Sequence, residues 1–281
     1  MHMTYEKGIH RPMVMGIQGV LGLEKDGFFG KLTDAAVRGY QGDNNLKTDG
    51  QVGQKTLSVM YNDGMSLTYR IFELIAFTEM GAVRNAWGAT STVPGDGAGK
   101  NYGVLQVNFG YGSAQQMRDK YLPANTGKSF EELMGSPVGA KAQYQYFMDK
   151  IFSRATSFAT KIGDSRPRTI AMLCDAITQG GGTYPSRKPR SYRDWVLEDD
   201  YLERVKEFYE KYPVKQAFIK SIINYSSPGR MFAELYPRSG VLRFLDDQLS
   251  RRRTIFNGYG RIHGSKYVLS ELGISNGECN D

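Results

Sequence analysis

The stretch DGFFGKLT at Asp26–Thr33 recurs as DGQVGQKT at Asp49–Thr56, 23 residues further along the chain. In each copy Asp-Gly predicts a tight turn, the second glycine permits a backbone conformation closed to other residues, and threonine lies near a helix start. The repeat therefore predicts three short helices, over Met13–Leu21, Thr33–Gln41 and Gln54–Met60, which together form a small module.

The residues around this repeat resemble the three-helix peptidoglycan-binding domain found on many wall hydrolases. The resemblance is carried by Ile17–Leu21, Asp26–Gln41 and Asp49–Leu57. It implies a cell-wall targeting module within residues 1–63; a helical extension packed on the main domain is the alternative. Helical spacing assigns the apolar positions to the module core rather than to ligand contacts. These positions are Ile17, Leu21, Val37, Tyr40 and Leu57.

Composition and charge exclude several classes of protein. The chain has 281 residues, of which 40% are hydrophobic and 33 are glycine, and a formal net charge of +7. This composition is typical of a folded protein with one large and one small domain and many permissive loops. No apolar stretch approaches the ~18–20 residues of a membrane span, so we expect no membrane insertion. The positive charge favours an anionic partner, but no basic motif with interleaved aromatics indicates nucleic acid.

Cysteine, histidine and serine patterns exclude further chemistry. Cys174 and Cys279 are too few for a disulfide scaffold, and the three histidines are scattered. We therefore expect free thiols, no zinc site and no cofactor. Gly110–Ser113 lacks the final glycine of a nucleophile elbow, which argues against a serine triad.

Helical patterns dominate residues 64–281, after a turn signal at Asn62-Asp63-Gly64 that we interpret as a linker. The sequence thus predicts a mainly α protein: the small three-helix module and a larger α-helical domain with a short β element. Tyr102–Asn108 is strand-like, and Phe256–Gly264 is expected to be a glycine-rich loop. The expected helices are Thr68–Met80, Ser113–Tyr121, Pro137–Phe158, Arg168–Thr178, Asp199–Glu210, Val214–Tyr225 and Val241–Phe256.

Two carboxylates in contrasting contexts suggest acid–base chemistry. Glu79 lies at the end of the apolar helix Arg70–Gly81, where we expect partial desolvation, as a general acid requires. Asp96 lies in the glycine-dense loop Gly95–Gly103, where we expect it to be ionised. Glycosidic cleavage uses such a pair. Spacing alone leaves open that both residues are structural.

The same segments resemble the lysozyme superfamily, through two of its branches. Chitosanases of glycoside hydrolase family 46 have a helix-borne glutamate, a loop similar to Gly95–Gly99, an apolar helix similar to Ala171–Gly181 and an arginine-bearing helix similar to Phe244–Arg253. Goose-type lysozymes and related lytic transglycosylases have a glutamate followed by a pattern similar to Gly103–Asn108. The resemblance implies a lysozyme-like, chitosanase-like catalytic domain over residues 64–281.

The resemblance also implies roles for individual residues. Glu79 would be the general acid and Asp96 the base that activates water, with inversion at a carboxyl separation of about 6.5–9.5 Å. Asp175 would support the acid helix through one of Arg251–Arg253, with Arg252 as the residue we select; a structural salt bridge is the alternative. The candidate sugar contacts are amides, hydroxyls and aromatic rings. They are Asn101, Tyr102, Gln106, Asn108, Thr178, Gln179 and Tyr184.

Two departures from these families qualify the resemblance. Asn101 stands where chitosanases place a water-orienting threonine. Asn108 stands where goose-type lysozymes place an acidic residue, and an amide cannot serve as a base.

Together the two resemblances predict an endolysin-like muramidase that cleaves peptidoglycan between MurNAc and GlcNAc. Peptidoglycan is favoured over chitosan because a protein of charge +7 is poorly suited to a cationic polymer. The N-terminus lacks the apolar core of a signal peptide, so we expect a phage enzyme that stays in the host cytoplasm until lysis. We also expect the protein to be a monomer. The alternatives are a lytic transglycosylase that needs only Glu79, and a non-catalytic wall-binding virion protein.

Overall fold

The computed structural model describes residues 3–94, 97–161, 163–178 and 245–275. Contacts group the chain into two compact units: Met1–Lys150 with Glu271–Ile274, and Ile151–Ser270. The described part is mainly helical with small sheets, which confirms the predicted fold class. No helix within it is long and apolar enough to cross a membrane. The helices expected over Asp199–Glu210 and Val214–Tyr225 lie outside the described residues.

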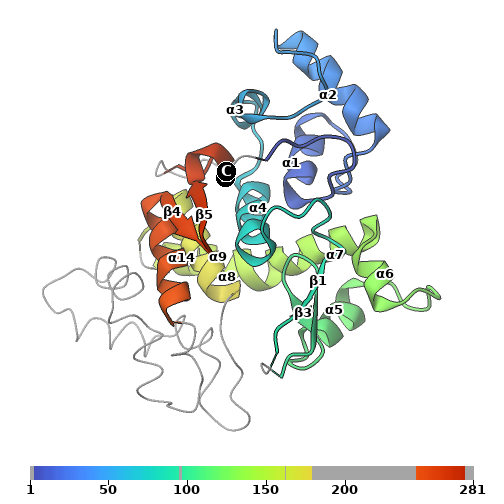
Figure 1. The fold of residues 1–281 in the computed structure, drawn as a ribbon, viewed down its shortest axis with the longest axis vertical. Helices are drawn as coiled ribbons and strands as arrows, with labels where there is room; N and C mark the ends of the chain where they lie inside the picture. Colours follow the sequence, from blue (N-terminus) through green and yellow to red (C-terminus); the bar gives the residue numbers. More distant parts are fainter. Residues whose placement is uncertain (1–2, 95–96, 162, 179–244, 276–281) are drawn as a thin grey trace, which may run out of the picture. The chain divides into compact units, whose positions relative to one another are not determined.

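Three short helices form at the N-terminus, as the repeat predicts: α1 (Pro12–Val20), α2 (Lys31–Asp43) and α3 (Gln54–Asn62) (Figure 1). The expected role of the glycines is wrong in one respect. The left-handed backbone belongs to the first glycine of each copy, Gly27 with φ +76° and Gly50 with φ +72°. The second glycine of each copy is an extended N-cap residue with negative φ, a conformation open to any residue.

An N-terminal arm, Tyr5–Arg11, runs beside both copies of the repeat. Tyr5 forms an antiparallel bridge with Val52, and His10 forms one with Phe28. Val52 and its counterpart in the first copy, Phe29, are fully buried. Phe29 and Val52, which occupy the same position in the two repeats, therefore each contribute a core side chain next to the arm.

Helix α4 (Leu67–Met80) carries Glu79 and packs against α1. It begins at Ser66, whose hydroxyl accepts a hydrogen bond from the Thr68 amide, and it ends at Gly81 with φ +66°. A helix commonly ends at a glycine in this region because other residues are strained there. The boundary predicted at residue 63 lies within the first compact unit.

A three-stranded antiparallel sheet follows α4, with β2 (Lys100–Tyr102) between β1 (Thr90–Thr92) and β3 (Val107–Asn108). The single strand expected over Tyr102–Asn108 is wrong, because positive φ angles at Gly103 and Gln106 reverse the chain between β2 and β3. The reversal places Asn101 opposite Asn108 in the register.

The rest of the first unit is helical. It comprises α5 (Ser113–Tyr121), α6 (Phe130–Met134) and α7 (Pro137–Phe147). Helix α6 was not predicted from the sequence, although a capping box begins it at Ser129. The helix expected over Pro137–Phe158 is interrupted by a π-helical turn, η1 (Met148–Phe152).

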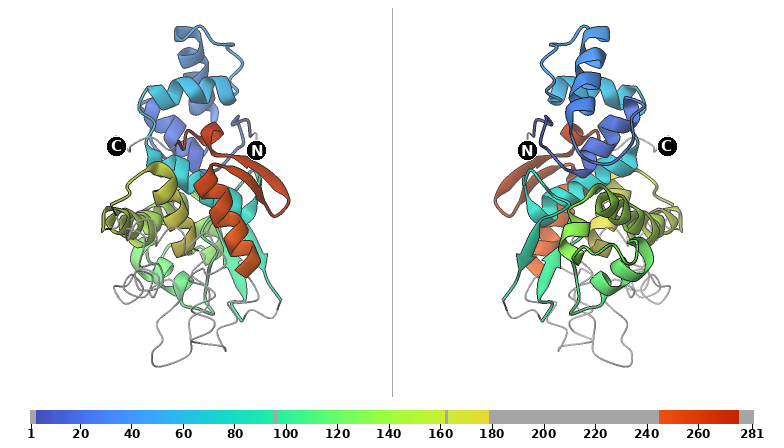
Figure 2. Two further views of the ribbon diagram at one scale, coloured as in Figure 1. Left: turned by 90° about the vertical axis from the view of Figure 1, so that its left-hand side faces the viewer. Right: turned by 90° about the vertical axis from the view of Figure 1, so that its right-hand side faces the viewer.

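The second unit contains α8 (Ser153–Lys161), α9 (Pro167–Thr178) and α14 (Leu245–Asn257), with α9 packed on the other two. A hairpin of β4 (Tyr259–Ile262) and β5 (Ser265–Val268) follows α14 (Figure 2, red), and a 3-10 turn, η4 (Leu269–Leu272), comes after it. The loop expected over residues 256–264 is therefore wrong: it contains the first strand of this hairpin.

Candidate functional site

A glutamine holds the Asp-Gly turn of the first repeat. The Gln18 side chain donates to Asp26 Oδ1 at 2.6 Å and accepts from the Gly27 amide at 2.9 Å. Asp26 Oδ1 also accepts from the Phe28 amide at 2.8 Å. Since Gln18 is only 2% exposed, these bonds form inside the module rather than on its surface.

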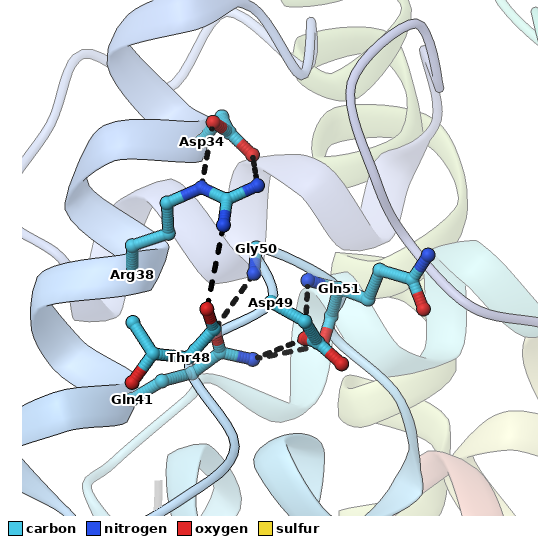
Figure 3. Close-up of polar contacts among 7 residues, drawn as sticks. All are labelled: Asp34, Arg38, Gln41, Thr48, Asp49, Gly50 and Gln51. Carbon is cyan, nitrogen blue, oxygen red and sulfur yellow. Dashed lines mark hydrogen bonds and ion pairs between the residues drawn. The ribbon is translucent and has the colours of Figure 1, made fainter.

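The second repeat reproduces the same bonds (Figure 3). Gln41 donates to Asp49 Oδ1 at 3.2 Å and accepts from the Gly50 amide at 2.9 Å, and Asp49 Oδ1 accepts from the Gln51 amide at 2.9 Å. Gln18 and Gln41 were not predicted from the sequence to be functional residues. The signal was present, because each glutamine precedes its Asp-Gly pair by eight residues in both copies.

The repeat threonines contribute to the same network. Gln18 donates to Thr33 Oγ1 at 3.3 Å, and Gln41 donates to Thr56 Oγ1 at 3.4 Å. Both threonines lie in the first turn of a helix, as expected, but neither is the N-cap residue. Each repeat is therefore a turn closed by glutamine, aspartate and threonine.

The two turns differ in what covers them. Trp87, fully buried, donates from Nε1 to the Gly27 carbonyl at 3.1 Å. Gly50 instead lies under the ion pair of Asp34 and Arg38, and Arg38 also donates to the Thr48 carbonyl at 3.3 Å (Figure 3). That pair is part of the surface, with the Arg38 side chain 46% exposed. The residues that cover the second turn are therefore exposed to solvent, whereas the ring that covers the first turn is buried.

Glu79, the predicted general acid, lies in the last turn of α4, and its side chain is partly exposed. Asp96, the predicted base, lies outside the described residues. The loop that carries Asp96 is packed closely just after it: the Gly110 amide donates to the Ala98 carbonyl at 3.3 Å. A Cβ on Gly110 would collide with the carbonyls of Gly97 and Ala98, so this approach requires glycine.

A second glutamate of α4, Glu73, is fully buried and was not singled out from the sequence. Its carboxylate accepts from Tyr5 Oη at 2.9 Å, from Arg11 Nε at 2.7 Å and from the Met13 amide at 3.1 Å. Burial, together with the neighbouring Glu73 carboxylate, raises the pKa of Tyr5. The available signal was a carboxylate in the middle of an apolar helix, because a buried carboxylate needs a cation.

The predicted amide contacts lie on the sheet, but two of them bond to each other. Asn108 Nδ2 donates to Asn101 Oδ1 at 3.0 Å, and Asn108 Oδ1 accepts from the Tyr111 amide at 2.9 Å. Asn101 is 6% exposed and Asn108 is 8% exposed. Gln106 is more open; its amide nitrogen donates to the Gly103 carbonyl at 2.8 Å, and its oxygen accepts from the hydroxyl of Ser91.

Tyr102 belongs to an aromatic cluster beside this sheet. Its ring meets Phe109 and Phe130 edge to face, with centroids 6.2 Å and 5.1 Å away. Phe109 is 41% exposed, and Tyr111 nearby in the chain is 46% exposed. These two exposed rings were not among the predicted contacts, although aromatic faces suit sugar rings.

The predicted supporting residues lie in the second unit. Asp175 is fully buried, and its partner is Arg251, whose Nη2 donates to Oδ1 at 2.6 Å and whose Nε donates to the same oxygen at 3.1 Å. Arg252, the arginine we selected, is also fully buried. Thr178 donates to the Cys174 carbonyl at 2.8 Å. The role of Asp175 toward Glu79 stays a prediction.

The remaining predicted contacts, Gln179 and Tyr184, lie outside the described residues, as does Cys279. Cys174 is a buried free thiol in α9. Burial, with a smaller contribution from the Asp175 charge, raises the pKa of Cys174. A thiol in this environment is chemically inert.

Comparison with known proteins identifies the N-terminal helices. Residues 17–60 match the family model described as "Putative peptidoglycan binding domain". The matched range contains both glutamine-held turns. A search of curated proteins found no match for the chain. The protein therefore carries an N-terminal module of the peptidoglycan-binding type, and this match supports bacterial peptidoglycan as its partner.

Proposed function

We propose that the protein is an endolysin-type peptidoglycan hydrolase that cleaves the glycan between MurNAc and GlcNAc. One observation carries this proposal: the module of peptidoglycan-binding type and the helix that bears Glu79 pack together in one compact unit. A wall-binding surface fixed to a partly exposed carboxyl group at a helix end would deliver that group to the glycan. The protein would wait in the host cytoplasm until lysis.

In the proposed mechanism, Glu79 protonates the leaving glycosidic oxygen and Asp96 activates a water molecule on the opposite face of the sugar. Direct displacement by water inverts the anomeric centre and requires carboxyl groups about 6.5–9.5 Å apart. The exposed rings of Phe109 and Tyr111 offer faces for sugar stacking, and Gln106 offers an amide.

A lytic transglycosylase is the second candidate, and the sheet favours it. Residues 100–108 of the sheet supply three amide side chains and no carboxylate. A reaction with one carboxyl group would use Glu79 first as acid and then as base, and it would yield an anhydro-sugar. A fragment lighter by one water, with an undiminished rate in Asp96→Asn, would select this candidate.

The substitution Glu79→Gln tests the proposal, because an amide retains the shape of the side chain but cannot donate an acidic proton. We expect the rate of wall solubilisation to fall by about 10²–10⁴-fold, the range typical of general acid catalysis. Binding to purified walls, measured by sedimentation, should not change. The matched control is Glu24→Gln, which alters an exposed pair with Lys141 and should keep full activity. Full activity in Glu79→Gln would contradict the proposal.

A further inference from the structure

Arg11 contacts one face of α4 from its middle to its end. The guanidinium is fully buried, its Nε donates to Glu73, and its Cζ lies 4.3 Å from the centroid of the Phe77 ring. Nη1 donates to the Gly81 carbonyl at 3.0 Å and to the Val83 carbonyl at 2.6 Å. Glu73, Phe77 and Gly81 are spaced by four residues, so they follow one stripe of the helix.

These contacts hold the chain directly after Glu79. The Gly81 and Val83 carbonyls belong to the segment that leaves the helix, two and four residues beyond Glu79. The same segment bonds to the arm through its backbone, since the His10 amide donates to the Arg84 carbonyl at 2.8 Å and the Ala86 amide donates to the His10 carbonyl at 2.9 Å. Glu79 lies on a different face of α4 from Phe77, so Arg11 acts on the backbone rather than on the carboxyl group.

The other side of the arm is bonded to both repeats of the module. Tyr5 exchanges two backbone hydrogen bonds with Val52, at 3.0 Å and 2.8 Å. The Gly8 amide donates to the Phe29 carbonyl at 3.0 Å. The arm therefore joins each repeat directly to the end of the Glu79 helix.

We propose that Arg11 is a positioning residue for Glu79 and that it fixes the acid helix to the wall-binding module through the Gly81 and Val83 carbonyls. This inference rests on the proposed function. Arginine is needed because its planar guanidinium can donate from Nε to Glu73 and, at the same time, from Nη1 to the Gly81 and Val83 carbonyls. Lysine keeps the positive charge beside Glu73 but has a single nitrogen, which cannot reproduce this geometry.

The test is Arg11→Lys in the full-length protein, assayed for wall binding and for the kinetics of wall cleavage. We expect kcat to fall at least tenfold while KM and wall affinity change less than twofold. A merely structural role would reduce activity only in proportion to the unfolded fraction, which thermal unfolding measures. In a double-mutant cycle, Arg11→Lys and Glu79→Asp should be non-additive, because both act through one carboxyl group. Arg261→Lys is the matched control, because Arg261 also donates to a backbone carbonyl, that of Gly264, but lies exposed in the β4–β5 hairpin; it should keep full kcat.

A second variant decides the matter if Arg11→Lys does not fold. The double substitution Arg11→Met with Glu73→Gln removes both buried charges while leaving an acceptor for Tyr5. The inference predicts a folded protein with the same tenfold loss of kcat. Full kcat in either folded variant, with Glu79→Gln inactive, would overturn the inference and leave the proposed function intact. Activity in Glu79→Gln itself would overturn the function.

Discussion

The two repeats of the N-terminal module have the same internal bonds but different surroundings. In both, a buried glutamine closes an Asp-Gly turn and accepts a hydrogen bond from the glycine amide at 2.9 Å. The first turn is covered by the buried Trp87 ring and receives a hydrogen bond from the Arg11 amide at 3.1 Å. The second turn is covered by the surface pair of Asp34 and Arg38. The repeated sequence specifies the turn. The residues that cover each turn, which lie outside the repeat pattern, decide whether the turn is bonded to buried parts of the unit or lies beneath exposed side chains.

The largest difference between the repeats is expected for alanine at the first glycine of each turn. Both glycines have positive φ, where alanine costs about 1–2 kcal/mol. A Cβ at Gly27 would also lie 2.7 Å from Trp87 Nε1, in a buried ring that cannot move freely. A Cβ at Gly50 would meet the ends of the Asp34 and Arg38 side chains, which can swing into solvent.

We therefore expect Gly27→Ala to destabilise the protein by about 3 kcal/mol and Gly50→Ala by about 1–2 kcal/mol, because overpacking adds to the strain only at Gly27. Urea unfolding of both variants measures the two values. Equal losses would show that the covering of the turn has no effect on stability.

Alanine at the two glutamines should have equal effects, since Gln18 and Gln41 are buried to the same degree and make equivalent bonds. Each substitution leaves a buried glycine amide without its acceptor, which costs about 1–3 kcal/mol. We expect the two free energies of unfolding to agree within about 0.5 kcal/mol. If these two free energies differed as much as those of the glycine variants, the difference in stability between the repeats would arise in the turns themselves rather than in the residues that cover them.

The smallest expected effect is a pH dependence in the second repeat. The hydrogen bond from the Gln51 amide lowers the pKa of Asp49 below its ordinary value. A carboxyl group whose pKa is lower in the folded state stabilises the fold above its unfolded pKa, near 3.9, and loses this contribution as pH falls through the folded value. The Tm advantage of the wild type over Asp49→Asn should thus be constant above about pH 5 and shrink below about pH 4. A Tm difference that is independent of pH from 6 to 2.5 would contradict this.

Local features of the fold were predictable from the sequence, and long-range features were not. Short-range backbone preferences produce the Asp-Gly turns and the helices that follow them. They also produce the end of α4 at Gly81. The register that pairs Asn101 with Asn108 depends on a chain reversal at Gln106, a residue type that rarely adopts positive φ. The hydrogen bond between these two predicted sugar contacts could therefore not be predicted from the sequence.

The candidate site shows the same division. The helix that bears Glu79 and its glycine end could be predicted from apolar periodicity. The buried pair of Arg11 and Glu73 joins residues 62 positions apart, and no local pattern links them. Tertiary packing alone brings the N-terminal arm to the end of this helix.

The most direct test of the account is the chemistry of what the intact protein releases from purified bacterial walls. Mass spectrometry of the soluble glycan fragments, with a count of new reducing ends, reports the bond that is cleaved and the nucleophile that is used. The account predicts fragments that end in reducing MurNAc and carry one added water per cleavage. Walls that bind the protein but release no glycan fragments would contradict the central claim that this wall-binding protein is a glycan hydrolase.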